Sequence, residues 1–183
     1  MALLVLVNGD LAVGKSVFAR RLGEIRNITV LTKDRMKELI CDAVGYRTRE
    51  ENYRFSVAVA SLFFHLAEET LKAGNDLLLE SNFRQYELDE LYRIAAARGA
   101  RVVTFVLEGD LHVLHERFLA RIAAGTRHAA HLSQDLSRFE DFERLLLENR
   151  KRTYSGDVHR FDNTVFDESL PARAASLLPP RES

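Results

Sequence analysis

The sequence has a single cysteine, almost no net charge and no long apolar run, and each shortage excludes a class of protein. Cys41 alone cannot close an internal disulfide, which suits a reducing compartment. A formal net charge of −1 gives no general attraction to nucleic acid or to an anionic membrane. The apolar runs are too short to span a bilayer, and no charged leader precedes the first of them. We therefore expect a cytoplasmic protein without a membrane partner.

The chain also lacks internal repeats, low-complexity tracts and linkers. Its 183 residues, of which 46% are hydrophobic and 29% charged, are enough for one domain with a sizeable core. We expect that domain to span residues 1–178, with a flexible tail over residues 179–183. The sequence does not distinguish a monomer from a homodimer.

Short apolar segments alternate with helical patterns, which is typical of an α/β fold with a doubly wound parallel sheet. The predicted strands are residues 2–7, 28–31, 76–81, 101–107 and 161–167. After the first strand and its helix, the predicted helices are residues 33–44, 50–73, 85–98, 111–123, 135–153 and 170–178. Because ligands bind beyond the carboxyl ends of strands in such sheets, the residues after each strand are candidates for a site.

The first predicted strand is followed by the phosphate-binding pattern G-x-x-x-x-G-K-[ST]. The residues of the pattern are Gly9, Asp10, Leu11, Ala12, Val13, Gly14, Lys15 and Ser16. An apolar strand before the pattern and an amphipathic helix after it provide the context that this motif requires. We predict that these residues, with Val17 after them, bind a nucleoside triphosphate.

The chemistry of this pattern lies in its backbone and in two side chains. Gly9 and Gly14 allow positive φ, so successive N–H groups can turn inward around a phosphate at the start of the helix. We expect the Lys15 ammonium to reach the β- and γ-phosphates and the Ser16 hydroxyl to ligate the magnesium ion that bridges them. Asp10 would repel phosphate from within the loop, so we expect its side chain to point outward.

Residues after the second predicted strand could serve the acceptor side of a reaction. Asp34 could take the proton of a substrate hydroxyl as that oxygen attacks the γ-phosphate. Lys37, one helical turn later, could hold an anionic substrate group or the transferring phosphate. The alternative is that Asp34 only caps the helix that begins there.

A second polar group follows the third predicted strand. Glu80 comes after three leucines, and a buried acid is costly unless it meets a cation, a metal or hydrogen-bond donors. We expect Glu80 to hold a magnesium-bound water or a substrate hydroxyl, with Asn82 and Arg84 contacting substrate. The alternative for Ser81 and Asn82 is to cap the next helix.

Arginines after the fourth predicted strand indicate a lid. Arg117 and Arg121 lie one turn apart on a helix face, and Arg127 and His128 follow in a polar stretch. A mobile lid over residues 117–132 would bring these arginines to the nucleotide once water is excluded. The alternative is the solvated basic face of a surface helix.

Together these motifs resemble the P-loop kinases, most closely the branch with zeta-toxin-like kinases, chloramphenicol phosphotransferase and the kinase domain of polynucleotide kinase. The segments that carry the resemblance are residues 8–16, 32–37 and 80–83, with Arg117 and Arg121. The resemblance implies a three-layer α/β/α sandwich whose five-stranded parallel sheet has the order 2-3-1-4-5, with a small helical lid. It also implies ATP and Mg²⁺ as cofactors.

The resemblance further implies roles for individual residues. Asp34 would be the base, Lys37 a substrate-side basic residue, and Arg121 the lid arginine that packs on adenine or reaches the phosphates. Residues 164–167 match the last strand of the family, near which adenine lies. No clear Asp-x-Asp follows the second strand, so Glu80 is the substitute for the missing metal contact.

The sequence therefore predicts an ATP-dependent phosphotransferase that acts on a hydroxyl of a small-molecule acceptor. Three alternatives stay open: a polynucleotide or nucleoside kinase, an ATP-binding protein without transfer, and a nucleoside triphosphatase. A polynucleotide kinase would need a basic groove, which the near-neutral charge disfavours. A triphosphatase would need a water-positioning residue, and the sequence marks none. Neither the acceptor nor the choice of ATP over GTP follows from the sequence.

Overall fold

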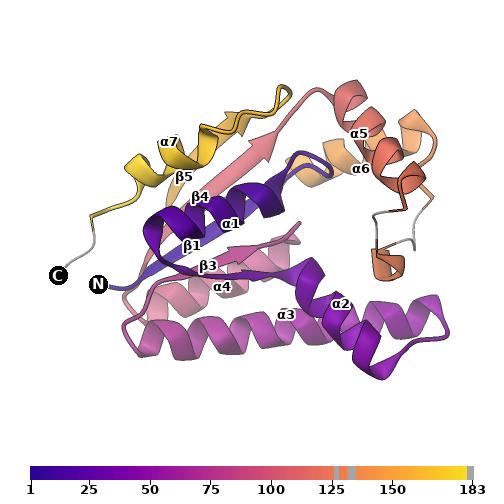
Figure 1. Ribbon diagram of the computed structural model, residues 1–183. Coiled ribbons are helices and arrows are strands. Elements are labelled where there is room, and N and C mark those ends of the chain that lie inside the picture. The colour runs from indigo at the N-terminus through magenta and orange to yellow at the C-terminus, as the bar shows by residue number, and fades with distance from the viewer. Residues whose placement is uncertain (126–127, 132–134, 181–183) are drawn as a thin grey trace.

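The computed structural model describes residues 1–125, 128–131 and 135–180 of the chain. These residues contain a five-stranded parallel sheet with the order β2-β3-β1-β4-β5, which confirms the predicted topology (Figure 1). The strands are β1 (Leu3–Gly9), β2 (Thr29–Thr32), β3 (Leu77–Glu80), β4 (Arg101–Glu108) and β5 (Asp157–Asp162).

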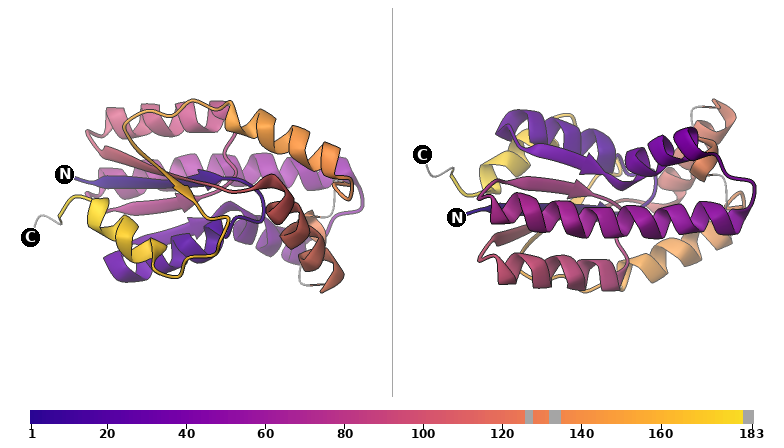
Figure 2. Two further views of the ribbon diagram at one scale, coloured as in Figure 1. Left: turned by 90° about the horizontal axis from the view of Figure 1, so that it is seen from above. Right: turned by 90° about the horizontal axis from the view of Figure 1, so that it is seen from below.

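Helices cover both faces of the sheet and complete a three-layer α/β/α sandwich (Figure 2). They are α1 (Lys15–Arg26), α2 (Lys33–Val44), α3 (Arg49–Lys72), α4 (Gln85–Ala97), α5 (Leu111–Ala123), α6 (Phe139–Arg150) and α7 (Leu170–Leu177), with a 3-10 turn η1 (Ala129–His131). Helices α1 and α7 lie on one face, and α3 and α4 on the other (Figure 2). The carboxyl ends of the strands point toward α2, α5 and η1, away from the two termini (Figure 1).

Alternating side chains of β1 build the two halves of the core. Leu3, Val5 and Val7 belong to the cluster with α1 and α7, whereas Leu4 and Leu6 belong to the cluster with α3 and α4. All of these side chains are buried. A strand covered on both faces has to be apolar throughout, which is why β1 reads as a continuous apolar run.

The last strand lies earlier in the chain than predicted. Residues 161–167 were expected, but β5 pairs with β4 over Asp157–Asp162. The segment after it leaves the sheet, and Val165 is 82% exposed. The prediction was wrong because β5 is a polar edge strand without an apolar run, whereas Val165 and Phe166 have strand-like side chains that stay outside the core.

Parts of two other predictions fall outside the described residues. They are Arg127 and Leu132 of the predicted lid and residues 181–183 of the predicted tail. Just before that tail, the carbonyl oxygen of Pro179 accepts a hydrogen bond from the Arg26 guanidinium. No helix within the described residues is long and apolar enough to cross a membrane.

Candidate active site

Residues 9–16 form a tight loop between β1 and α1. The backbone has positive φ at Gly9 (132°), Ala12 (60°) and Gly14 (98°). A Cβ atom on Gly9 would lie 1.9 Å from the carbonyl oxygen of Leu107 on β4, so only glycine fits there. Gly14 is the N-cap of α1, and the first N–H groups of that helix therefore open onto the loop. This backbone is suited to bind an anion.

The Lys15 ammonium lies inside the loop. Its Nζ donates hydrogen bonds to the carbonyl oxygens of Asp10 (2.6 Å) and Gly9 (3.1 Å), and the residue is only 9% exposed. Burial lowers the pKa of Lys15, while nearby carboxylates, Glu80 first among them, act to raise it. An ammonium held by two carbonyl groups can transfer its hydrogen bonds to phosphate oxygens, which are stronger acceptors.

Glu80 ends β3 where the neighbouring strands also end. The parallel register sets it opposite Val7 of β1 and Thr32 of β2. The residue is 4% exposed, and its Oε2 accepts a hydrogen bond from Ser16 Oγ at 3.1 Å. Burial raises the pKa of Glu80 to about 7, although the Lys15 charge and the Ser16 hydrogen bond act to lower it.

Ser16 and Glu80 together fit a magnesium ion beside a bound phosphate. Both offer oxygen atoms, which Mg²⁺ prefers, and the two side chains are already in contact. Within the described residues, no group of three or more His, Cys, Asp or Glu side chains could hold a metal by itself. A magnesium ion beside a bound phosphate takes few protein ligands, because phosphate oxygens and water complete its shell.

Asp34 lies in the first turn of α2 with its side chain 75% exposed. Its charge acts on the pKa values of both Lys15 and Glu80, which means that it is close to the loop. The N-cap of α2 is Thr32, and within the described residues no side chain caps this helix. The structure therefore does not support the capping alternative for Asp34. The Asp34 carboxylate lies accessible beside the phosphate loop.

Lys37 and Asn52 hold η1 against α2 and α3. Lys37 Nζ donates to Asn52 Oδ1 (2.6 Å) and to the carbonyl oxygen of Ala130 (3.1 Å), which also accepts from Asn52 Nδ2 (3.2 Å). Burial lowers the pKa of Lys37. Two further contacts join η1 and the residue before it to α2: His131 Nε2 with Glu38 Oε1 (3.1 Å) and His128 Nε2 with Asp42 Oδ1 (2.9 Å). The Lys37 ammonium thus holds part of the predicted lid, and its contact with substrate stays a prediction.

Asn82 and Arg84 follow β3, and the structure adds Arg152 to this group. Arg152 lies just after α6, and its Nη1 donates to Asn82 Oδ1 at 2.6 Å. Arg84 Nη1 donates to the hydroxyl of Tyr53 on α3 at 3.0 Å. No motif marks Arg152, because it stands among other charged residues and meets Asn82 only across the fold. The substrate contacts of Asn82 and Arg84 stay predictions.

Asp10 does not point outward, and that expectation was wrong. The residue is 1% exposed and forms an ion pair with Arg150 at the end of α6 (Nη2–Oδ2, 2.5 Å). The N–H group of Gly109 donates to the same carboxylate at 3.2 Å. Arg150 therefore neutralises the acid that would repel a phosphate. The sequence could not show this, because the two residues are 140 positions apart.

Arg117 of α5 contacts the connection between β5 and α7. Its guanidinium donates to the carbonyl oxygens of Asn163 (Nη1, 3.1 Å) and Thr164. Asn163 in turn is buried, and its Nδ2 donates to the Val13 carbonyl oxygen in the phosphate loop at 2.7 Å. A pocket of about 630 Å³ lies at this connection, lined by Asp162 and residues 164–168. The segment predicted to lie near adenine thus adjoins the phosphate loop.

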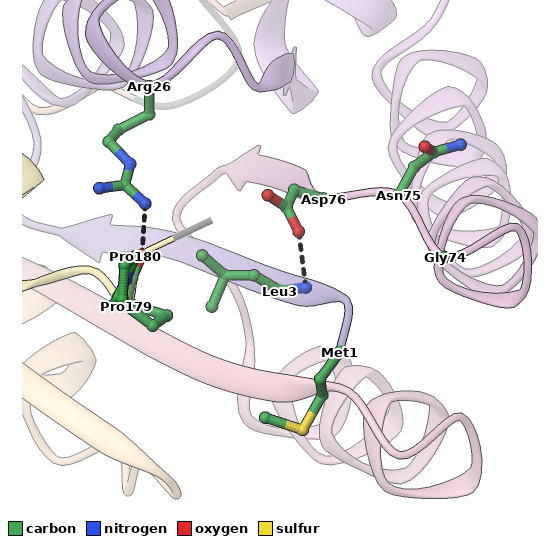
Figure 3. Close-up of a pocket in the computed structure, with 8 residues that line it drawn as sticks. All are labelled: Met1, Leu3, Arg26, Gly74, Asn75, Asp76, Pro179 and Pro180. Atoms are coloured by element: carbon green, nitrogen blue, oxygen red, sulfur yellow. Dashed lines mark hydrogen bonds between the residues drawn. The ribbon is translucent and has the colours of Figure 1, made fainter. Parts of the chain in front are cut away.

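A second pocket, of about 350 Å³, lies at the amino ends of the strands (Figure 3). It is bordered by Arg26, Asp76 and the two prolines at 179 and 180, and Asp76 Oδ1 accepts a hydrogen bond from the Leu3 N–H group at 2.9 Å. Ligands of parallel sheets bind at the opposite end, where the phosphate loop lies. We therefore place the candidate site at the loop and not at this pocket.

The sheet order and the phosphate loop define a P-loop kinase fold. Residues 4–142 match a protein family described as an AAA domain. That match spans well over half of the sequence, and the chain belongs to this family. No curated protein matches the sequence.

Three solved structures illustrate the likeness. A provisionally assigned kinase from Chloroflexus aurantiacus J-10-fl is 25% identical, with a TM-score of 0.84 and 96% of each chain covered. A gluconokinase from Sinorhizobium meliloti 1021 is 15% identical, with a TM-score of 0.55, covering 93% of this chain and 87% of its own. The APS kinase of Mycobacterium tuberculosis, solved with AMPPNP and APS, is 15% identical, with a TM-score of 0.58 and coverage of 96% and 95%. The predicted resemblance to the P-loop kinases is confirmed.

Replacing Glu80 with Gln should change how stability depends on pH. The pKa of Glu80 in the folded protein, about 7, lies above its ordinary value of 4.5. The folded state therefore binds this proton more tightly, so the stabilisation is complete below pH 4.5 and is lost as the pH rises through 7. The loss is on the order of 3 kcal/mol. Denaturant unfolding between about pH 4 and pH 8 should show this fall in the wild-type protein and a flatter dependence in Glu80→Gln.

Glu69→Gln, at an exposed position of α3, is the matched control and should follow the wild-type curve. Parallel curves for the wild type and Glu80→Gln would contradict the raised pKa.

Proposed function

We propose that the protein is an ATP-dependent kinase that transfers the γ-phosphate to a hydroxyl of a small-molecule acceptor. One observation carries this proposal: functional side chains gather where β1, β2 and β3 end. They are Lys15, Ser16, Asp34 and Glu80. A protein that only bound ATP would need the loop alone. An accessible carboxylate beside the loop is the additional group that transfer to a hydroxyl requires.

Each group has a role in the proposed reaction. The loop backbone and the start of α1 bind the phosphates, and Lys15 stabilises the charge on the transferring phosphoryl group. A magnesium ion, held by Ser16 and Glu80, would supply further positive charge to the phosphates. Asp34 takes the acceptor hydroxyl proton as the oxygen bonds to phosphorus, and ADP leaves with the electron pair of the broken P–O bond.

The structural neighbours support a small acceptor. Gluconokinase and APS kinase are each named for the phosphorylation of a small molecule. At 15% identity their likeness concerns the fold, so their acceptors are not assigned to this chain. A panel of hydroxyl compounds incubated with ATP and Mg²⁺, and read by mass spectrometry for the gain of one phosphoryl group, would identify the acceptor.

Asp34→Asn should separate phosphoryl transfer from nucleotide binding. The variant keeps the size of the side chain but cannot take a proton, so turnover should fall by about 10² or more while ATP affinity changes little. Glu69→Gln, at an exposed position of α3, is the control and should keep full turnover. Full activity of Asp34→Asn on the acceptor would exclude this residue as the base.

The proposal includes a lid over residues 117–132. Arg117 contacts the β5–α7 connection, Arg121 is exposed one turn further along α5, and η1 lies against α2 through Lys37. A nucleotide bound between these segments would give both arginines a phosphate or a base to contact. Excluding water there strengthens each such contact.

Hydrogen exchange with and without a non-hydrolysable ATP analogue tests the lid. Protection should rise in peptides that cover α5 and η1, because the arginines gain contacts when the nucleotide is bound. Arg121→Ala should lower turnover more than it lowers the free energy of unfolding. Unchanged exchange, with full turnover of Arg121→Ala, would leave α5 as a surface helix with a basic face.

A further inference from the structure

Three cationic side chains lie near one another between the phosphate loop and the side of the site where the acceptor would bind. Lys15 is inside the loop, Arg152 is half-buried beside it, and Arg84 is exposed after β3. The proximity of each neighbouring pair is seen in their electrostatics: Arg152 acts to lower the pKa of Lys15, and Arg84 acts to lower that of Arg152. Burial is the largest cause that lowers the pKa of Lys15 and of Arg152, and the neighbouring cation adds to it in each case. An anion bound beside Arg152 would offset both effects.

The partners of the two arginines within the described residues are neutral. Arg152 donates to the side-chain oxygens of Asn82 (Nη1, 2.6 Å) and Asn149 (Nη2, 2.7 Å). Arg84 donates to the Tyr53 hydroxyl and lies over the Tyr53 ring, 5.3 Å from its centroid. These contacts fix the two guanidinium groups in place without neutralising them.

Glu87 is the carboxylate that acts on both arginines, and it is already paired. Its carboxylate forms a buried ion pair with Lys33 and accepts hydrogen bonds from the Tyr86 hydroxyl and from the backbone N–H group of Arg84. One carboxylate shared with Lys33 does not balance two further arginines. The two arginines therefore share one carboxylate that acts on both of them, and Lys33 already pairs with it.

A second observation concerns the side-chain amide of Asn149, which contacts Arg152. The Nδ2 atom of Asn149 is buried and has no hydrogen-bond partner among the described residues. The orientation of this amide is set by its oxygen, which accepts from Arg152, so the NH₂ group cannot be exchanged for the oxygen. A buried donor without a partner is rare in folded proteins, and a bound anion or water beside Arg152 would supply the acceptor that this donor lacks.

We propose that the phosphate acceptor carries an anionic group, a phosphate, sulfate or carboxylate, and that Arg152 and Arg84 bind it. This rests on the proposed kinase function and names the class of its acceptor: a hydroxyl compound with a negative charge. Both arginines offer the planar donor pairs that match two oxygens of one anionic group. A neutral acceptor would leave the half-buried Arg152 guanidinium with neutral hydrogen-bond partners alone among the described residues.

The first test uses inorganic sulfate as the probe. The protein is saturated with a non-hydrolysable ATP analogue and Mg²⁺, so that the phosphate loop is filled, and sulfate is then titrated by calorimetry. Sulfate should bind, and Arg152→Gln and Arg84→Gln should each weaken it by about tenfold or more. Arg93→Gln, on the exposed face of α4, is the matched control and should bind sulfate as the wild type does.

The second test compares acceptors in matched pairs, such as a sugar with its phosphate ester and an alcohol with the corresponding hydroxy acid. Phosphoryl transfer should favour the anionic member, and Arg84→Gln should raise its KM with little change in kcat. A preference for the neutral member, or sulfate binding that neither variant weakens, would overturn the proposal.

Two outcomes separate this proposal from the function on which it rests. If Arg152→Gln weakens binding of the ATP analogue and leaves sulfate unaffected, Arg152 serves the nucleotide, and the anionic acceptor is rejected while the kinase stands. If the analogue does not bind the wild-type protein at all, the proposed kinase function fails and this proposal fails with it.

Discussion

The common end point of β1, β3 and β2 is the constraint on which the site depends. Parallel pairing sets Glu80 between Val7 and Thr32, so the chain that continues from each strand arrives at the same edge. The phosphate loop follows β1 and Asp34 follows β2. Without that register Lys15 and Glu80 would each lose the opposite charge that acts on it most strongly.

Lys15 and Glu80 tolerate burial because their opposite charges attract each other. Desolvation lowers the pKa of Lys15 and raises that of Glu80, and in both cases the charge of the other group acts against the shift. Ser16 adds a hydrogen bond to the Glu80 carboxylate. Even so, the Glu80 carboxyl group has a pKa of about 7, so it is partly protonated near neutral pH. A bound cation would favour its ionised form.

The loop is held in its conformation by contacts from the end of α6 and from the segment after β5. Arg150 pairs with Asp10, and Asn163 donates to the Val13 carbonyl oxygen. Both contacts come from the last third of the chain, after the predicted lid. Neither anchor of the loop is therefore part of the predicted lid.

Local patterns in the sequence were sufficient to predict the sheet and the loop, but not the contacts between distant segments. The Gly9–Ser16 pattern follows an apolar strand. Because adjacent residues set the geometry of this loop, the pattern was enough to predict it. The range of β5 could not, because a polar edge strand is defined by its pairing with β4 and not by its own residues. The burial of Asp10 could not be predicted either, because it depends on the ion pair with Arg150, which lies far away in the sequence. The position of Arg152 beside Asn82 also depends wholly on the fold.

The central claim is that Lys15 and the loop around it bind the phosphates of ATP, and calorimetric titration of ATP with Mg²⁺ tests it most directly. The wild-type protein and Lys151→Ala, which removes an exposed lysine of the ion pair with Glu148, should bind with equal affinity. Lys15→Ala should lose a charge-assisted contact to buried phosphate and bind at least about tenfold more weakly. Equal affinity of Lys15→Ala and the wild type, or no binding by the wild type, would contradict the account.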